Sequence, residues 1–212
     1  MPVKATYKKI WQPQSSLKKT KDLFEEVLQT KKALYSSFDL YFEDESRFGL
    51  FTRNGRALTA RGVKPICPYL HKFENLYLFG AFSPVSGNSL LLEMPYCNSD
   101  TFEVFLNHLS ALNKETFNIV VLDNGAFHKA KRLVIPDNIG LLFLPAYSPE
   151  LNPAEQIWRI LKKTICNKVF KTLDELSAHL SSVIKNIITP DSIKSITGYD
   201  SYLSAYQTIY DL

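Results

Sequence analysis

Three carboxylates stand at positions where the chain could use them for chemistry. Asp44 closes an alternating, strand-like segment, Asp123 follows a short apolar run, and Glu155 opens a segment with helical spacing. A carboxylate at the carboxyl end of a central strand lies where open sheets bind their ligands. If the two strands are neighbours, Asp44 and Asp123 meet and repel each other. A divalent cation would remove that repulsion, and hard oxygen ligands favour Mg²⁺ or Mn²⁺.

The helix that carries Glu155 would add positive charge to this site. At about 100° per residue, Trp158, Arg159 and Lys162 fall on the same arc as Glu155, while the aliphatic residues form another arc. Acids that bind two metal ions roughly 3.5–4 Å apart, beside cations, are suited to phosphodiester chemistry. A purely structural interpretation stays open, because Glu155 could stabilise its helix N-terminus or pair with Arg159, and strand-end aspartates are common in turns.

The hydrophobic pattern predicts the elements that would position these residues. Strands are expected at residues 38–44, 76–82, 89–94, 117–123 and 140–145, and helices at about 99–112, 128–134, 154–168, 173–188 and 201–209. The strands first meander and then alternate with helices. This order is typical of a mixed sheet flanked by helices, and not of a parallel doubly wound sheet. A further helix is expected at residues 18–34, in a basic lead-in without a core of its own.

The charge of the chain is only mildly basic, +4 in total, but it is unevenly distributed. Residues 1–32 hold eight lysines and three acids, residues 47–72 hold six basic side chains and no acid, and residues 159–171 hold five and no acid. Separate basic clusters around a neutral body fit a polyanionic partner, although a solvated surface gives the same pattern. The candidate DNA contacts of the second cluster are Arg47, Arg53, Arg56, Arg61 and Lys64.

Composition excludes several classes of protein. With 45% hydrophobic and 22% charged residues in 212, the chain is expected to form one globular domain with a short appendage. No stretch approaches the ~18 apolar residues of a membrane span, and the N-terminus lacks the apolar run of a signal peptide. Three cysteines without CxxC spacing argue against a disulfide framework and against a zinc cluster. These features predict a cytoplasmic protein that does not associate with membranes.

Two longer motifs narrow the interpretation. DNGAFH at residues 123–128 and LPAYSPELNPAEQIW at residues 144–158 are similar to motifs of DDE-superfamily transposases, in the mariner-like branch of bacterial insertion sequences. FEDESRFG at residues 42–49 resembles the first acidic motif of that family. The segments at 61–65 and 79–87 resemble those that follow it, so the resemblance runs from about residue 41 to residue 198.

This resemblance implies an RNase H-like fold over residues 37–198, preceded by a basic linker or helix at 1–36 and followed by a helical tail at 199–212. It implies a catalytic triad of Asp44, Asp123 and Glu155 that holds Mg²⁺ or Mn²⁺, as two ions. The triad would nick DNA at transposon ends and then join the 3′ ends to target DNA. Residues near the triad are expected to support the metal ligands or to face DNA, and they are Asn124, His128, Trp158, Arg159 and Lys162.

Relatives in this branch act as dimers on two DNA ends, so a homodimer associated with the bacterial nucleoid is expected. They also begin with a helix-turn-helix region that reads the ends, and this sequence starts after it. We therefore expect a separately encoded helix-turn-helix partner, a frameshift fusion, or a catalytically idle DNA-binding remnant. An RNase H-like nuclease acting on RNA or a hybrid is a further alternative. A two-carboxylate glycosidase would leave the basic clusters without a role.

Overall fold

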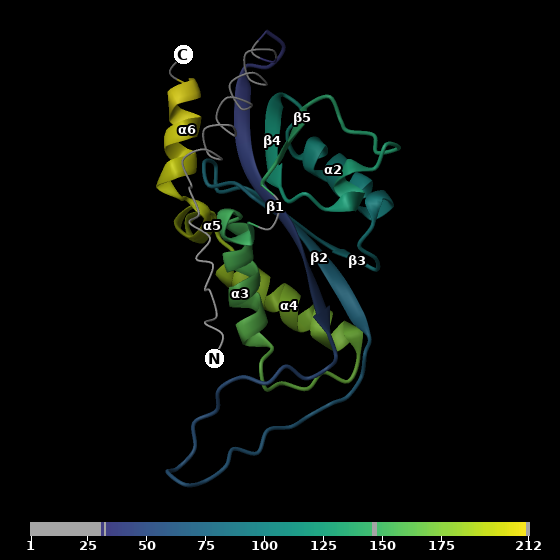
Figure 1. Cartoon of the computed structure of the whole chain (residues 1–212), viewed down its shortest axis with the longest axis vertical. Helices are drawn as coiled ribbons and strands as arrows, with labels where there is room; N and C mark the ends of the chain where they lie inside the picture. Colours follow the sequence, from purple (N-terminus) through teal and green to yellow (C-terminus); the bar gives the residue numbers. More distant parts are fainter. Residues whose placement is uncertain (1–30, 32, 146–147, 211–212) are drawn as a thin grey trace, which may run out of the picture.

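A five-stranded mixed sheet forms the centre of the molecule, as Figure 1 shows for the computed structural model, which describes residues 31, 33–145 and 148–210. The strands are β1 (Ser37–Gly49), β2 (Asn75–Phe82), β3 (Ser89–Met94), β4 (Thr116–Leu122) and β5 (Ile139–Phe143). Their order in the sheet is β3-β2-β1-β4-β5. The pairs β1–β2 and β2–β3 are antiparallel, and the pairs β1–β4 and β4–β5 are parallel. The expected mixed five-stranded sheet is therefore confirmed.

Helices cover both faces of this sheet (Figure 1). The helices are α2 (Ser99–Leu112), α3 (Ala154–Thr164), α4 (Leu173–Ile187), α5 (Pro190–Thr197) and α6 (Asp200–Tyr210), with 3₁₀ turns η1 (Ala126–Lys129) and η2 (Pro149–Leu151). Alternate residues of β1 enter two different cores. Phe42 and Phe48 pack with α3 to α6, whereas Tyr41 packs with α2. None of the described helices is both long enough and apolar enough to cross a membrane.

The length of β1 decides where the first carboxylate lies. Pairing between β1 and β4 runs from Ser37 opposite Thr116 to Phe42 opposite Val121, and there it stops. β1 continues to Gly49, paired only with β2. Two residues beyond Phe42 and Val121, the same register brings Asp44 level with Asp123. The strand expected at residues 38–44 is thus longer than its pattern indicated.

Two further expectations about helices differ from the structure. The helix expected at 128–134 is replaced by η1, because contacts with α2 draw the following residues into turns: Val134 N–H donates to Glu103 Oε2, and Arg132 Nη2 donates to Ser99 Oγ. α3 ends at Thr164, since Asn167 takes a left-handed backbone with φ 57°. The cap of α2 is Asn98, whose Oδ1 accepts the N–H groups of residues 100 and 101.

The helix α5 is an element that the hydrophobic pattern did not predict. It has clear terminal signals: Thr189 and Ser192 form a reciprocal capping box, and Pro190 occupies its first turn. The helix expected at 173–188 is confirmed as α4, where Thr172 Oγ1 accepts Glu175 N–H. Most of the helix expected at 18–34 lies outside the described residues.

The last helix, α6, packs on the main core. The ring of Tyr202 lies 4.8 Å from that of Phe42, and its hydroxyl donates to the carbonyl of Leu151. The hydroxyl of Tyr206 donates to the carbonyl of Phe38 at 2.7 Å. The segments 37–198 and 199–210 therefore share one hydrophobic core.

Candidate active site

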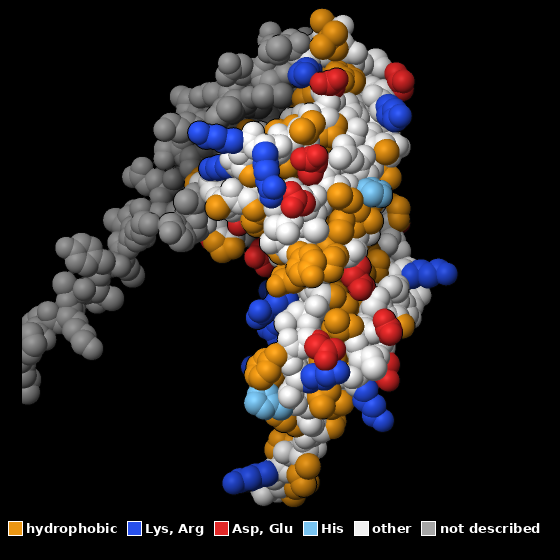
Figure 2. Space-filling model, turned by 90° about the vertical axis from the view of Figure 1, so that its right-hand side faces the viewer, with side chains coloured by type: hydrophobic (Ala, Val, Ile, Leu, Met, Phe, Trp, Pro, Cys, Tyr) orange, Lys and Arg blue, Asp and Glu red, His pale blue; other side chains and the backbone are white. Residues whose placement is uncertain are grey.

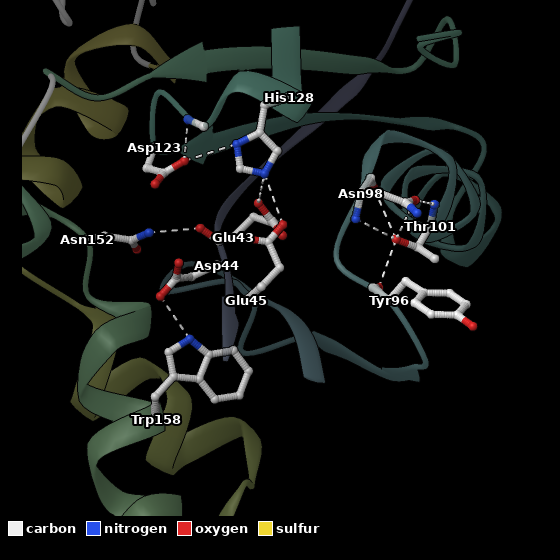
Figure 3. A network of polar contacts seen from close by, with 11 residues as sticks. Glu43, Asp44, Glu45, Tyr96, Asn98, Thr101, Asp123, His128, Asn152 and Trp158 are labelled. Atoms are coloured by element: carbon white, nitrogen blue, oxygen red, sulfur yellow. Dashed lines mark hydrogen bonds and ion pairs between the residues drawn. The ribbon is translucent and has the colours of Figure 1, made fainter. Parts of the chain in front are cut away.

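Asp44 points from β1 toward α3 and is largely withdrawn from water. Its Oδ2 accepts the indole N–H of Trp158 at 2.9 Å, as Figure 3 shows. Burial raises the pKa of the Asp44 carboxyl well above its usual range, and the carboxylates of Glu155 and Glu45 raise it further. A cation bound here would relieve both the desolvation and the repulsion.

Asp123 follows the last residue of β4, and its side chain is 63% exposed. Its Oδ1 accepts the backbone N–H of Gly125 at 2.7 Å and lies 3.0 Å from His128 Nδ1. Both contacts use the same oxygen. Among the described residues, the other oxygen, Oδ2, has no contact of this kind, and Asp123 lines a pocket that a ligand could enter.

Glu155 lies in the first turn of α3, where the helix dipole favours a negative charge. Asn152 fixes this helix end against β1: its Nδ2 donates to the carbonyl of Glu43 at 2.8 Å (Figure 3). Its Oδ1 accepts Ala154 N–H at 3.1 Å. Because Glu43 precedes Asp44, this one amide ties the helix of the third carboxylate to the strand of the first.

The three carboxylates line one cavity of about 370 Å³. Asn124 lines it as well, and its side-chain amide donates to the carbonyl of Leu144 while Lys129 Nζ donates to its Oδ1. The donors offered to a ligand are hard oxygens, the type preferred by Mg²⁺ and Mn²⁺. The residues present therefore fit a divalent-metal site.

The carboxylates on either side of Asp44 face the opposite layer. Glu43 is fully buried, and neither of its carboxylate oxygens has a hydrogen-bond partner among the described residues. Burial raises the pKa of Glu43 well above its usual range, and the charges of Glu45 and Asp44 add to this. His128 Nε2 donates to Glu45 Oε1 at 2.9 Å and lies 3.9 Å from Glu43 Oε2. These carboxylates also affect Cys97: desolvation, and then the charges of Glu45, Asp123 and Asp44, raise its pKa to about 11.

Two of the residues expected beside the triad are buried. His128 is 2% exposed, and its contact with Asp123 favours a role in supporting that carboxylate over a role in facing DNA. Trp158 is 1% exposed, so its side chain lies in the core although its helical position is on the arc of Glu155. The indole reaches back between Phe48 and Phe82, and Gly80 makes the room, because a Cβ there would lie 2.7 Å from the indole.

A basic groove continues from the cavity along α3. It has a volume of about 590 Å³ and shares Glu155 and Pro149 with the carboxylate cavity. Its cationic lining residues come from two segments of the chain and are Arg53, Arg159, Lys162 and Lys163. The structure thus brings together Arg53, Arg159 and Lys162, which were expected to face DNA.

Asn167 holds the segment that carries Arg53, one of the groove cations, in place. Its backbone N–H donates to the carbonyl of Arg53, its Oδ1 accepts Gly55 N–H, and its Nδ2 donates to the carbonyl of Arg56. Asparagine tolerates the left-handed backbone that this position requires. Asn167, which lies shortly after α3, therefore fixes the start of the segment that follows β1.

The remaining expected DNA contacts lie farther from the cavity. Arg56, Arg61 and Lys64 are exposed on residues 51–74, a projecting arm without regular secondary structure (Figure 1). Toward its tip, basic and hydrophobic side chains are exposed on the face shown in Figure 2. Arg47 is exposed on β1, and strand alternation places it on the face of Glu43 and Glu45, opposite Asp44. The structure therefore does not place Arg47 with the groove cations.

Sequence reasoning gave no role to four residues that shape this site: Glu43, Glu45, Gly125 and Asn152. Asn152 and Gly125 lie inside the quoted motifs, so a motif signal existed for both. Glu43 and Glu45 flank Asp44, and the alternation of β1 was the signal that they face the other layer.

Comparison with known proteins shows to which family this chain belongs. The sequence pattern of the DDE superfamily endonucleases matches residues 39–177, about two thirds of the chain. The chain belongs to the DDE superfamily of endonucleases. An uncharacterized protein of Sinorhizobium fredii, y4pE/y4sA, is 32% identical over 123 residues, which cover 57% of this chain and 91% of that protein. The family expected from the motifs is therefore confirmed.

Solved structures of Mos1 transposase share the fold of this DDE protein. The Mos1 paired-end complex with the left transposon end matches 92% of this chain with a TM-score of 0.59 at 15% identity. The catalytic domain of Mos1 mariner transposase matches 94% of it with a TM-score of 0.54 at 14% identity. The chain spans 62% of the Mos1 chain in the paired-end complex and 96% of the catalytic-domain structure. The expected RNase H-like catalytic fold is confirmed.

Proposed function

We propose that this protein is the catalytic domain of a transposase, which cuts DNA at transposon ends and joins the ends to target DNA. The observation that carries the proposal is the convergence of Asp44, Asp123 and Glu155 on one cavity. They come from strand β1, from the residue after strand β4 and from helix α3, and a groove lined by cations opens beside them. Neither a plain turn aspartate nor a helix cap accounts for all three.

The same three carboxylates are proposed to hold two Mg²⁺ or Mn²⁺ ions. The paired-end complexes of Mos1 include one with Mg and one with Mn. Such ions, when bound, activate the attacking oxygen and stabilise the leaving oxygen of a phosphodiester. In this chain, the indole N–H of Trp158 orients Asp44, Gly125 N–H and His128 orient Asp123, and Asn152 sets the position of the helix that carries Glu155.

The groove along α3 is proposed to carry the DNA backbone into the cavity. Arg53, Arg159 and Lys162 line it, and the N-terminal end of α3 adds its dipole. The arm at residues 51–74 would extend the contact through Arg56, Arg61 and Lys64. Arg47 is proposed to contact DNA from the other face of β1.

A helix-turn-helix region is proposed to recognise the particular DNA ends. A helix-turn-helix partner, encoded separately or joined by frameshifting, would bring the catalytic domain to its ends. We further propose that two copies act together as a homodimer. Light scattering that finds only monomers, both with and without DNA, would contradict the dimer.

The test is nicking of supercoiled plasmid in Mg²⁺ or Mn²⁺ by the wild type and by Asp123→Asn. We expect wild-type nicking that requires the metal and is lost in the variant, with Asp174→Asn, an exposed change on α4, as the matched control. A wild type that binds DNA but cuts in neither metal would favour the idle remnant. Cleavage restricted to RNA or a hybrid would replace the transposase with an RNase H-like nuclease.

A further inference from the structure

His128 bridges two carboxylates that belong to different strands. Its Nε2 lies 2.9 Å from Glu45 Oε1 on β1, and its Nδ1 lies 3.0 Å from Asp123 Oδ1 after β4 (Figure 3). The ring is buried between Phe102 and Phe127, at centroid distances of 4.5 and 4.1 Å. A ring packed in this way cannot rotate. Its two nitrogens therefore hold the carboxylates of Glu45 and Asp123 in fixed positions relative to each other.

Asp123 needs such a restraint. Its side chain is mostly exposed and lies beyond the end of β4, where ladder hydrogen bonds no longer hold the chain. Asp123 Oδ1 accepts the hydrogen bond of Gly125 N–H and also lies within ion-pair distance of His128 Nδ1, which has no hydrogen-bond partner of its own among the described residues. The packing is tight here, since a Cβ on Gly125 would lie 3.0 Å from both Asp123 Oδ1 and His128 Nδ1.

We propose that Glu45, acting through His128, is a positioning residue that fixes the rotamer of Asp123 and leaves Oδ2 free for the metal site. The functional half of this proposal rests on the proposed function, because Asp123 is taken as a metal ligand. The geometric half stands on the metal-free protein. Partners that orient a metal ligand in this way typically affect metal affinity by about 10–100-fold.

A competing use of the same side chains is a separate cation site. Glu43, Glu45 and His128 offer three ligand atoms that lie within 4.8 Å of one another, and both oxygens of the buried Glu43 lack a hydrogen-bond partner among the described residues. The positioning proposal is favoured because His128 already meets Glu45 at hydrogen-bond distance and Asp123 with its second nitrogen. The experiment below distinguishes the two.

The test uses two substitutions of one residue that separate its two nitrogens. In His128→Asn the amide nitrogen replaces Nδ1 and keeps the nitrogen that lies 3.0 Å from Asp123 Oδ1, whereas in His128→Gln it replaces Nε2 and keeps only the link to Glu45. Both variants lose the ring, so a packing defect affects both. Thermal unfolding and the amide spectrum establish that each variant is folded, and the exposed His108→Asn is the surface control.

The metal-free readout is the backbone amide of Gly125, observed by nuclear magnetic resonance and hydrogen exchange. Because this N–H donates to Asp123 Oδ1, its chemical shift and protection report the position of the carboxylate. Loss of the ring itself shifts this resonance in both variants, so exchange decides: we expect His128→Gln to speed it and His128→Asn to leave it close to that of the wild type. Equal behaviour of the two variants would overturn the proposal, whether or not the protein cuts DNA.

The functional readout is the Mn²⁺ concentration that gives half-maximal nicking. We expect it to rise by roughly 10–100-fold in His128→Gln and in Glu45→Ala, and much less in His128→Asn and in Glu45→Gln, which retains an acceptor for Nε2. No rise in Glu45→Ala would overturn the role of Glu45. Absence of nicking in every variant and in the wild type would count against the proposed function alone, since the Gly125 readout remains.

The ion alternative is tested by elemental analysis of the purified protein. We expect no tightly bound transition metal attributable to these side chains. An equimolar ion that is lost in Glu43→Gln, with nicking and the Gly125 resonance otherwise retained, would replace the positioning role with a metal site.

Discussion

Neighbouring carboxylates on the two faces of β1 have different surroundings. Asp44 faces α3, where an indole N–H contacts one oxygen and an open cavity lies beside it. Glu43 and Glu45 face α2, where Glu43 has no hydrogen-bond partner among the described residues and Glu45 meets His128. Burial raises the pKa of both Glu43 and Asp44, but only Asp44 lines a space that a cation can enter.

This difference shows that three acids in a row need not form one site. Strand alternation separates them into a residue that faces the reaction and residues that support it. An acidic tripeptide is therefore best interpreted together with the layers above and below its strand.

The largest expected effect separates Asp44 from Glu43 in DNA nicking. Asp44→Asn should lower the nicking rate by at least roughly 10³-fold, because metal-held charge stabilisation is worth several kcal/mol. Glu43→Gln should stay within about threefold of the wild type, since its side chain does not line the cavity. Plasmid nicking at saturating Mn²⁺ measures both. Equal losses in the two variants would break the distinction between the faces.

Trp158→Phe should lower nicking by about 10-fold. The substitution keeps most of the packing with Phe48 and Phe82 but removes the N–H that Asp44 Oδ2 accepts, a charge-assisted bond worth about 1.5–3 kcal/mol. Single-turnover nicking rates measure the loss. Phe48→Leu, which alters the same cluster without touching Asp44, is the control. An equal loss there would assign the effect to packing.

Glu43→Gln should change the pH dependence of stability by a few °C in Tm. A carboxyl whose folded pKa is raised contributes stability that is present below its unfolded pKa and is lost as pH rises through the folded pKa. The stability of the variant relative to the wild type should therefore increase as the pH rises above about 4.5, the ordinary pKa of a glutamate. Thermal unfolding across this range, without metal, measures it.

Thermal unfolding in the presence of Mn²⁺ further separates the roles of Glu43 and Asp44. It should raise the Tm of the wild type and of Glu43→Gln alike, because ligand binding to the folded state stabilises it. Asp44→Asn should gain little. A Mn²⁺ shift that disappears in Glu43→Gln but persists in Asp44→Asn would reverse the roles of the two faces.

Lys162→Gln should produce the smallest effect, a DNA affinity about two- to threefold weaker with a salt slope lower by about one. Lys162 lines the groove on the α3 face, 6.0 Å above the ring of Phe48. Fluorescence anisotropy at several salt concentrations measures it. The control is Lys114→Gln, exposed before β4 at the opposite end of the sheet. An equal change in both variants would mean that DNA does not follow the groove.

The sequence predicted the parts of this molecule that repeat a simple pattern. Asp123 was evident because a run of apolar residues ended there, and the mixed sheet followed from the order of the elements. The sequence left Trp158 open between the core and a DNA-facing position, because the space that accepts the indole is made by Gly80 on another strand. The roles of His128 and Asn152 depend on partners 83 and 109 residues away, which local spacing cannot reveal.

The contacts around the cavity make the positions of Asp123 and Glu155 independent of the number of residues between them. Thirty-one residues lie between Asp123 and Glu155, yet neither carboxylate is held through the turns that connect η1 to β5. Pairing of β5 with β4, the amide of Asn124 on Leu144, and that of Asn152 on β1 fix the two ends independently. Insertions or deletions at the exposed residues Val134 and Ile135 should therefore leave both carboxylates in place and be selectively neutral. Among homologues, the acid-to-acid interval would then record ancestry and not catalytic competence.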